Sequence, residues 1–536
     1  MVSGKSVLSF VFVLFAFSLS AQDSRYMIFF QDKQGTSYDI SNPAEFLGPR
    51  AVERRTRHGL QVVEQDLPVS NAYVEGVRNA GATVMHTTRW MNGVLVACDD
   101  DTRVVLESLP FVSRVEYVAP GGKPSPSGRR RVSSRTKDLG ASLATAKQLS
   151  LVGIDEMHAE GYTGEGVHIA LMDAGYPGVN TAEPFQHIFD DDRLIDAYDF
   201  VHDDPDAFVQ SNHGTSVLSV IAGYAPDVYI GGAYGASFHL YITEDVAGEY
   251  RIEEYNWLFA AERADSAGAD IISTSLGYNT FDDPAMNYDK SALDGKTTVI
   301  ARAAQWASER GLVVVSSAGN EGNNAWKTIT TPADNEHVLA VAATNANGVR
   351  SPISSIGPSA DGRIKPDVGA MGIGVSVINP SGGLGMASGT SLAAPIVTGL
   401  LAGIWQKYPH LSNHQLLHAV RATASQSENP DHLLGYGIPN FQAVSNMLDW
   451  QPQDKPMIVA PNPVVDTLLI RPDEPEQETC LVEIVSLQGQ VLSSQTATFN
   501  WIAQGFQADF SKLPVGMYFL RVRTGQEVYS FKIVKL

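Results

Sequence analysis

The longest regular pattern in the chain is an alternation of apolar strands and amphipathic helices between residues 148 and 450. The strands are rich in β-branched residues and apolar on both faces, which is typical of a parallel sheet covered by helices on both sides. Sites in such sheets form at the carboxyl ends of the strands. The predicted strands are 166–173, 228–234, 269–277, 311–320 and 337–345, and the predicted helices include 257–268, 299–311 and 413–425.

A smaller mixed pattern precedes this α/β domain, in residues 22–119. Strands are predicted at 26–30, 93–98 and 111–118, and helices with Asn or Ser starts and Gly ends at 42–59 and 70–81. This pattern predicts a small α+β domain. Residues 120–147 begin with a stretch rich in Pro, Gly, Ser and Arg, which cannot bury apolar area and is predicted to be an exposed linker.

The two ends of the chain have patterns of their own. After a linker at 451–456, residues 457–536 show short strands at regular spacing with turn signals between them, which favours a small β-sandwich. At the other end, Lys5, an apolar run from Val7 to Leu19 and small residues to Ala21 are typical of a secretory signal peptide, residues 1–21. That run of about 13 residues is shorter than the roughly 20 that span a bilayer, and no later stretch is long enough. We therefore expect a soluble, exported mature protein.

Composition narrows the classes of partner. The chain has 536 residues and a formal net charge of −21, and a nucleic-acid partner would require a basic face instead. Its two cysteines, Cys98 and Cys480, fall in different predicted domains, so no structural disulfide is expected despite export.

Four residues stand where predicted strands end or helices begin: Asp173, His213, Asn320 and Ser391. Each has an ordinary structural interpretation by itself: turn formers at Asp173 and Asn320, a structural histidine, and a helix cap at Ser391. Those interpretations do not explain why all four residues are predicted on the same side of one sheet.

The chemistry of acyl transfer needs this set of groups. A serine hydroxyl is a weak nucleophile until an imidazole takes its proton, and a buried carboxylate holds the imidazole in the required tautomer. A fixed amide donor, with the backbone N–H at a helix start, stabilises the charge that develops on the carbonyl oxygen. The residues therefore predict a hydrolase that works through an acyl-enzyme.

The motifs around these residues, at 169–176, 212–223, 316–322 and 388–399, resemble in sequence and order those of the subtilisin-like serine peptidases, over about 300 residues. The resemblance implies that Asp173 orients, His213 is the base, Ser391 the nucleophile and Asn320 the oxyanion donor. It also implies that Ser275, Leu276, Gly277 and Tyr278 form the strand that binds a peptide substrate.

Three positions depart from the usual family pattern: Ala174 where Thr is more frequent, Ser216 where many members have a second His, and Tyr278 where Gly is common. The first two lie outside the triad, so they leave the implied mechanism unchanged. A bulky ring at Tyr278 would narrow the pocket for the residue before the scissile bond, so no substrate preference is carried over.

The flanking domains also resemble known modules. Residues 22–119 resemble the propeptide of such peptidases, which assists folding and blocks the cleft until it is cut, here within residues 119–147. The last domain, with its segments 460–470 and 513–536, resembles the C-terminal sorting domain of type IX secretion. The implied partners are protein or peptide substrates, the chain's own propeptide and the secretion machinery, and the implied location is secreted or cell-surface.

No cofactor is expected to take part in the chemistry. Acidic segments at 190–193 and 281–284 offer carboxylates for structural calcium, although acidic surface loops are commoner in a chain this acidic. Two alternative functions are compatible with the same sequence. One is a catalytically silent binding module on the same scaffold, and the other is an adhesin whose terminal sandwich does the binding.

Overall fold

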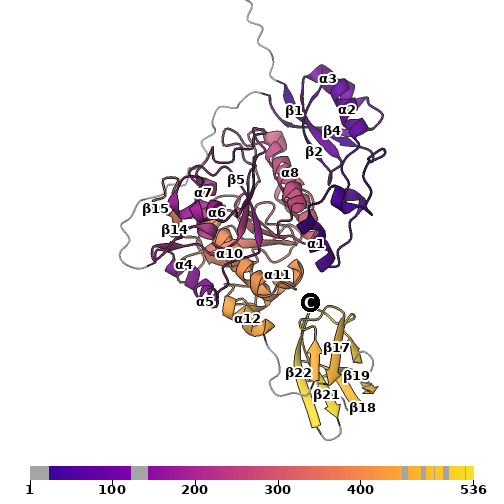
Figure 1. The fold of residues 1–536 in the computed structure, drawn as a ribbon, viewed down its shortest axis with the longest axis vertical. Coiled ribbons are helices and arrows are strands. Elements are labelled where there is room, and N and C mark those ends of the chain that lie inside the picture. Colours follow the sequence, from indigo (N-terminus) through magenta and orange to yellow (C-terminus); the bar gives the residue numbers. More distant parts are fainter. Residues whose placement is uncertain are drawn as a thin grey trace, which may run out of the picture.

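The computed structural model describes residues 23–121, 143–449, 457–472, 479–487, 489–498, 506–524 and 527–536. The predicted signal peptide and most of the predicted linker at 120–147 lie outside these residues. The described elements form three units along the chain (Figure 1), which we call the N-terminal, peptidase and C-terminal units. The predicted boundaries between them stay predictions.

The N-terminal unit is an antiparallel sheet with helices. Its strands are ordered β2-β3-β1-β4, so β1 pairs with both β3 and β4. The strands are β1 (Ser24–Phe30), β2 (Thr83–Thr88), β3 (Gly93–Cys98) and β4 (Val112–Ala119), and the helices are α1 (Pro49–Arg57), α2 (Asn71–Asn79) and α3 (Asp100–Glu107). The α+β prediction is confirmed, but the predicted helix at 42–59 is wrong in extent. Pro43 and Pro49 each start a separate helix, a single 3-10 turn at Pro43–Glu45 and then α1, because proline lacks the N–H that a continuous helix needs.

The peptidase unit is built on a seven-stranded parallel sheet in the order β13-β12-β11-β10-β5-β9-β6. The strands are β5 (His168–Asp173), β6 (Leu194–Asp199), β9 (Ser237–Ile242), β10 (Ile271–Thr274), β11 (Val313–Ser317), β12 (Val338–Thr344) and β13 (Val368–Met371). The predicted α/β fold with a covered parallel sheet is confirmed.

Helices cover both faces of this sheet (Figure 1). Alternate residues of β5 show why: Ile169 and Leu171 pack into the core beneath α7 and α10, whereas Ala170 and Met172 pack into the core beneath α8 and α9. The helices are α4 (Ala146–Ser150), α5 (Ile154–Ala159), α6 (Gln186–Asp190), α7 (His213–Ala222), α8 (Ile252–Ala267), α9 (Val299–Glu309), α10 (Thr390–Lys407), α11 (Asn413–Thr423) and α12 (Phe441–Leu448). Two short hairpins complete the unit: β7 (Tyr224–Ala225) with β8 (Tyr229–Ile230), and β14 (Val375–Ile378) with β15 (Leu384–Ala387).

The predicted core strand at 228–234 is wrong. Only Tyr229–Ile230 is extended, in the hairpin with β7, because the following glycines bring the backbone against two helices. A Cβ on Gly231 would lie 2.5 Å from the carbonyl oxygen of Ile221, and one on Gly232 would lie 3.1 Å from the Cα of Gly399. The sheet strand is instead β9, a few residues further along the chain, which pairs with β5 and β6.

The C-terminal unit has two antiparallel sheets, ordered β16-β17-β20 and β19-β18-β21-β22, with a core made only of its own residues. The strands are β16 (Met457–Ala460), β17 (Thr467–Pro472), β18 (Thr479–Ser486), β19 (Val491–Thr498), β20 (Phe506–Asp509), β21 (Gly516–Thr524) and β22 (Glu527–Lys535). Cys480 is buried in β18, and Cys98 in β3 carries a free thiol, as the sequence predicts.

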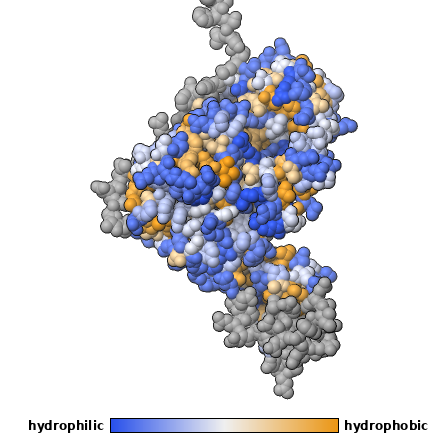
Figure 2. Space-filling view, in the orientation of Figure 1, coloured by the Kyte–Doolittle hydropathy of each residue, from blue (hydrophilic) through white to orange (hydrophobic). Residues whose placement is uncertain are grey.

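Hydrophilic residues cover much of the face of the N-terminal and peptidase units seen in Figure 2, and hydrophobic residues gather in patches between them. Among the helices of the described residues, none is both long and apolar enough to cross a membrane.

Candidate active site

Asp173 ends β5, near the middle of the parallel sheet, and its side chain is almost fully buried. Its Oδ1 lies 2.7 Å from Nδ1 of His213 and accepts a further hydrogen bond from the backbone N–H of Ala174 at 2.7 Å. The carboxylate is thus held by its own turn and faces the imidazole. This contact orients the ring with Nδ1 toward the carboxylate, so that Nε2 is the nitrogen turned away from Asp173.

His213 is the first residue of α7, and the glycine that follows it lets the helix approach β5 closely. A Cβ on Gly214 would lie 2.4 Å from the carbonyl oxygen of Gly175 and 3.1 Å from the Cβ of Asp173. The hydroxyl of Thr215 ties the same turn by donating to the carbonyl of Pro177 at 2.8 Å. Glycine at 214 is therefore a steric requirement of the Asp173–His213 contact.

Ser391 is the second residue of α10, and its side chain is nearly buried. Its Oγ donates to the carbonyl of Ser275 at 3.2 Å, and the hydroxyl of Ser275 donates to the carbonyl of Ser391 at 2.9 Å. In an ordinary helix that carbonyl would accept from the residue four positions on, but here that residue is Pro395, which has no N–H. Ser275 takes its place, so the start of α10 is attached to the end of β10.

Asn320 follows β11 and is tied to the residue before Ser391. Its Oδ1 accepts from the backbone N–H of Thr390 at 2.9 Å and from the hydroxyl of Thr390 at 3.1 Å. Both bonds use the oxygen of the amide, so its Nδ2, which has no hydrogen-bond partner within the described residues, remains as a donor. The residue is exposed, so this donor is accessible to a ligand.

The segment Ser275–Tyr278 continues from β10 along the same edge of the sheet. Leu276 is half-buried and Gly277 is exposed, and in the described parts of the chain their backbone N–H and C=O groups bond to no other backbone. An extended peptide could pair with them as an added strand. Tyr278 ends the segment by pairing with Thr331 through both backbone groups, at 3.0 and 3.3 Å.

The ring of Tyr278 points into the interior of the peptidase unit. It is 1% exposed, stacks on Phe281 with ring centroids 6.0 Å apart, and donates a hydrogen bond to Glu244. The ring is therefore packed in the core of the unit. The expected narrowing of a substrate pocket by Tyr278 stays a prediction.

One acidic cluster in the described residues has the geometry to hold a cation: oxygens of Glu244, Glu249 and Glu253 lie within 4.8 Å of one another. It lies outside the two acidic segments singled out from the sequence. There, Asp191 pairs with Arg193 at 2.9 Å and Asp282 accepts from the backbone N–H of Glu249 at 3.1 Å. These glutamates are spaced along a turn and the start of α8, so no short sequence motif indicates the cluster.

The four candidate residues therefore lie at the same edge of the sheet, at the carboxyl ends of its strands. His213 bonds to the end of β5, Ser391 to the segment after β10, and Asn320 follows β11 and bonds to Thr390. Strands β5, β10 and β11 are direct neighbours. Sequence reasoning missed two residues that hold this arrangement, Pro395 and Thr390. The signal that could have found the first is a proline four residues after the serine.

Comparisons with known proteins assign each of the three parts of the chain to a family. The model of the Subtilase family matches residues 164–437. That of the Peptidase S8 propeptide domain of Bacteroidota matches 25–133, and that of the Secretion system C-terminal sorting domain matches 459–536. The sorting domain points to type IX secretion.

Individual relatives match about half of the chain. Subtilisin NAT of Bacillus subtilis subsp. natto is 29% identical over 301 residues, which are 55% of this chain and 70% of that protein. Subtilisin of Bacillus pumilus is 28% identical over 301 residues, covering 55% of this chain and 97% of that one. A solved structure, MycP3 protease from the type VII (ESX-3) secretion system, aligns with a TM-score of 0.46 at 20% identity, covering 60% of this chain and 94% of that one. The chain thus belongs to the subtilase family, peptidase S8, and is a subtilisin-like serine endopeptidase.

Proposed function

We propose that the protein is an exported endopeptidase whose catalytic residues are Asp173, His213, Ser391 and Asn320. The observation that carries this assignment is the 2.7 Å contact between Asp173 Oδ1 and His213 Nδ1, formed by residues 40 positions apart in the chain. Burying a carboxylate is costly unless a positively charged partner offsets its desolvation. The buried Asp173 is therefore better explained if the imidazole of His213 gains positive charge during catalysis than if the histidine is only structural.

The reaction proceeds in two halves. Ser391 Oγ adds to the carbonyl carbon of the scissile peptide bond while its proton passes to His213 Nε2, and the same proton then passes to the leaving amine as the C–N bond breaks. Water attacks the resulting ester in the second half, with His213 again as the base. The acyl group leaves Ser391 as a carboxylic acid, and Ser391 Oγ regains its proton from His213.

Negative charge on the carbonyl oxygen is stabilised by two donors. Nδ2 of Asn320 is the first, because Oδ1 is held by Thr390. The backbone N–H of Ser391, at the start of α10, is the second. Peptide substrates lie along Ser275–Gly277 and pair with the backbone there, so the enzyme acts on extended segments of protein or peptide chains.

The test is labelling of the secreted protein with a fluorophosphonate beside a Ser391→Ala variant. Labelling of the unaltered chain alone supports the assignment. Labelling of neither form supports a silent binding module or an adhesin, and equal turnover by the variant would reject Ser391 as the nucleophile. Loss of this serine is expected to lower kcat by about 10⁶, a magnitude taken from subtilisin, a relative of this chain.

The proposed chemistry uses no cofactor. The carboxylate cluster of Glu244, Glu249 and Glu253 bonds through Glu244 to Tyr278, whereas the proposed catalytic groups are an imidazole, a hydroxyl and an amide. Exhaustive chelation is therefore expected to leave the rate per fluorophosphonate-labelled site unchanged within about twofold. A loss of turnover at constant labelling, restored by calcium, would show that a cation supports the cleft.

Maturation and export follow from the flanking units. We assign cleavage to residues 119–147, between the N-terminal and peptidase units, and recognition by the secretion machinery to residues 457–536. Amino-terminal sequencing of the exported protein is expected to give a start within 119–148. A start before Arg25, or one inside the parallel sheet, would contradict the maturation step.

A further inference from the structure

In the proposed reaction, the side chain of the substrate residue before the scissile bond enters between two backbone segments. One is Ser275–Gly277, along which the peptide is proposed to lie, and the other is Ala318–Asn320, which leads to the proposed oxyanion donor. These segments follow β10 and β11, which are direct neighbours in the sheet. The substrate residue pairs with the first segment and turns its carbonyl oxygen toward the second. Whatever occupies the space between them therefore limits which residue is accepted.

Both segments turn a glycine toward one side chain, that of Thr330, which lies on the chain between β11 and β12. A Cβ on Gly277 would lie 2.1 Å from Thr330 Oγ1 and 3.0 Å from its Cβ. A Cβ on Gly319 would lie 3.0 Å from Oγ1 and 3.2 Å from Cγ2 of the same residue. Thr330 therefore fills the space between the two glycines, and neither position could carry a side chain without displacing it.

The backbone of Thr330 is fixed to both segments. The next residue, Thr331, pairs through both backbone groups with Tyr278, which follows the first segment, at 3.0 and 3.3 Å. The N–H of Thr330 itself donates to the carbonyl of Ala318 in the second segment at 3.4 Å. Since threonine is branched at Cβ, its side chain has few other rotamers once the backbone is held. A substrate cannot easily push it aside.

The second segment cannot easily move away from Thr330 either. Ser355 lies behind it, so that a Cβ on Gly319 would meet the Ser355 Oγ at 2.8 Å. The N–H of Ser355 donates to the carbonyl of Gly319 at 2.9 Å, and its Oγ accepts from the N–H of Glu321 at 3.0 Å. The residues on each side of the oxyanion donor are thus tied to the same serine. Widening the space would require breaking these bonds.

The hydroxyl of Thr330 offers a polar contact inside this space. It has no hydrogen-bond partner within the described residues, although the residue is only 4% exposed. Buried polar groups in folded proteins are nearly always paired, because an unpaired one loses its bonds to water without compensation. The hydroxyl of a substrate serine would supply a partner, whereas a large apolar side chain would cover the group and leave it unpaired.

We propose that Thr330 is a specificity-determining residue, which limits the substrate residue before the scissile bond to glycine, alanine or serine. This inference rests on the proposed function and names the class of peptide bond that the same site cuts. Leucine or phenylalanine would need the volume that Thr330 fills between Gly277 and Gly319. Serine is preferred to alanine because it bonds to the Thr330 hydroxyl.

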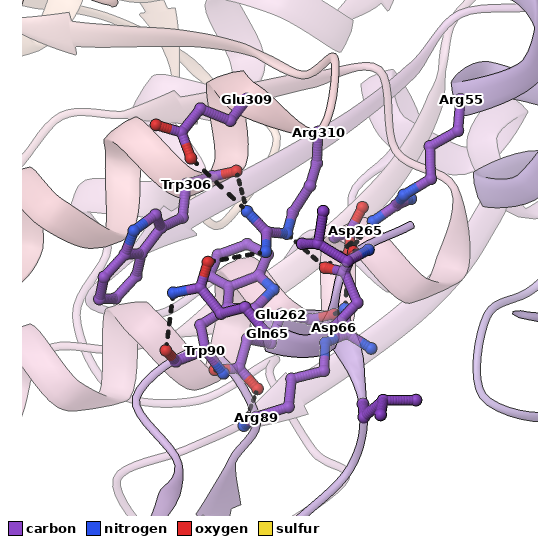
Figure 3. A network of polar contacts seen from close by, with 12 residues as sticks. Arg55, Gln65, Asp66, Arg89, Trp90, Glu262, Asp265, Trp306, Glu309 and Arg310 are labelled. Atoms are coloured by element: carbon purple, nitrogen blue, oxygen red, sulfur yellow. Dashed lines mark hydrogen bonds and ion pairs between the residues drawn. The ribbon is translucent and has the colours of Figure 1, made fainter. Parts of the chain in front are cut away.

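Substitution of Thr330 leaves the polar contact between the N-terminal and peptidase units unchanged. In that contact Arg89 donates to Asp265, and Arg310 donates to Asp66, both at 2.6 Å (Figure 3). The residues labelled in Figure 3 belong to the N-terminal unit, to α8, and to α9 and the residue after it, and none belongs to the two segments or to the stretch that carries Thr330. A change of specificity in a Thr330 variant therefore reports on the cleft.

The experiment uses a series of peptides that differ only before the scissile bond, with Gly, Ala, Ser, Leu or Phe there. The cut position is confirmed by mass spectrometry, and kcat/KM is normalised to fluorophosphonate-labelled sites. Every chain carries the recognition sequence of a site-specific protease within residues 122–142, so that cutting of the linker does not depend on the altered specificity. The unaltered enzyme is expected to cut the Ala peptide at least about 10²-fold more efficiently than the Phe peptide.

Thr330→Gly is expected to abolish this preference, so that the Phe peptide is cut at least as efficiently as the Ala peptide. Thr330→Val keeps a branched side chain and is expected to exclude Phe still, but to lose a preference of about fivefold for Ser over Ala. The matched control is Thr328→Ala on the same stretch. The Thr328 hydroxyl makes one long bond, 3.4 Å, to the carbonyl of Trp326, so all ratios should stay within about twofold.

Equal efficiency on the Ala and Phe peptides in the unaltered enzyme would overturn the proposal, as would an unchanged ratio in Thr330→Gly or an equal change in Thr328→Ala. A Ser preference that persists in Thr330→Val would overturn the role of the hydroxyl. If Thr330→Gly is not labelled, Thr330→Ala decides, since it removes only Oγ1 and Cγ2 and is expected to raise kcat/KM for the Leu peptide at least tenfold. Absence of both labelling and cleavage in the unaltered chain would reject the proposed function, and this inference with it.

Discussion

Asn320 accepts two hydrogen bonds from Thr390, at 2.9 Å from the backbone N–H and 3.1 Å from the hydroxyl, although the two residues are 70 positions apart. The bonds orient the amide so that oxygen faces α10 and nitrogen remains to donate. They also join the end of β11 to the residue before Ser391. One side chain therefore both supplies a donor and sets the distance between that donor and the proposed nucleophile.

Replacing Asn320 by Ala is expected to lower kcat by about 10² to 10³ with little change in KM, because a donor to a developing oxyanion acts mainly in the transition state. The magnitude is that of the amide donor in subtilisin, a relative of this chain. Asn320→Asp is the informative companion, since it keeps the oxygen that holds Thr390 and removes the donor. Steady-state kinetics on a peptide substrate, normalised to fluorophosphonate-labelled sites, would separate the two roles. An unchanged kcat in both variants would remove Asn320 from the mechanism.

Gly214→Ala is expected to weaken both stability and activity. The added Cβ would lie 2.4 Å from the backbone oxygen of Gly175, so α7 must move away from β5 and take His213 with it. We expect a loss of about 1–3 kcal/mol in the free energy of unfolding and about a 10²-fold fall in kcat. Thermal unfolding and kinetics check both effects.

The control for that variant is Ser216→Ala on the same helix. Its hydroxyl makes one long bond, 3.3 Å, to the carbonyl of Asn212 within the helix, so we expect changes within about 0.5 kcal/mol and near-normal turnover. If Gly214→Ala behaved like this control, the close approach of α7 to β5 would not matter for the Asp173–His213 contact.

Glu254 is expected to make stability fall as pH rises. Burial raises the pKa of this carboxyl from 4.5 to about 7, although Tyr288 and the backbone N–H of Ile300 donate to it. The folded chain therefore holds this proton more tightly than the unfolded chain. The contribution of Glu254 to stability is greatest below about pH 4.5 and is lost as the pH rises to about 7. Over this pH range the free energy of unfolding is expected to fall by about 3 kcal/mol because of Glu254.

The measurement compares melting temperatures of Ser391→Ala chains with and without Glu254→Gln, between pH 5 and pH 8. The glutamine keeps a neutral side chain at every pH, so the chain with Glu254 should lose melting temperature relative to it as pH rises. A constant difference across this range would mean that Glu254 does not change its protonation state there.

Deleting residues 457–536 is expected to block export and to leave the peptidase folded. The hydrophobic core of the C-terminal unit contains none of the residues that form the cores beneath α7 to α10, so its removal exposes no peptidase core. Fluorophosphonate labelling of cell extract and of medium, from cells with a type IX secretion system, would measure both effects. Normal labelling in the medium would reject the sorting role.

Much of the fold follows from local sequence because the signals are local. Strands such as β5 and β11 are continuous apolar runs bounded by turn residues, and the order Asp173, His213, Asn320, Ser391 within four family motifs implied their roles. The error at 228–234 has the opposite origin. Two glycines there serve contacts with helices, Gly231 with the end of α7 and Gly232 with the distant Gly399 of α10, and an apolar run of that kind is not distinguishable from a strand by its own pattern.

The sequence alone determined which residues are proposed to carry the chemistry, since hydroxyl, imidazole, carboxylate and amide are properties of side chains and their order is written in the chain. Only the tertiary structure decided which contacts hold these residues in place. It attached Ser275 to the carbonyl left free by Pro395, turned Tyr278 into the core, and placed Arg54 between the ends of α8 and α9. Those contacts join residues up to 256 positions apart, and which distant groups meet depends on the packing of the whole sheet and its helices.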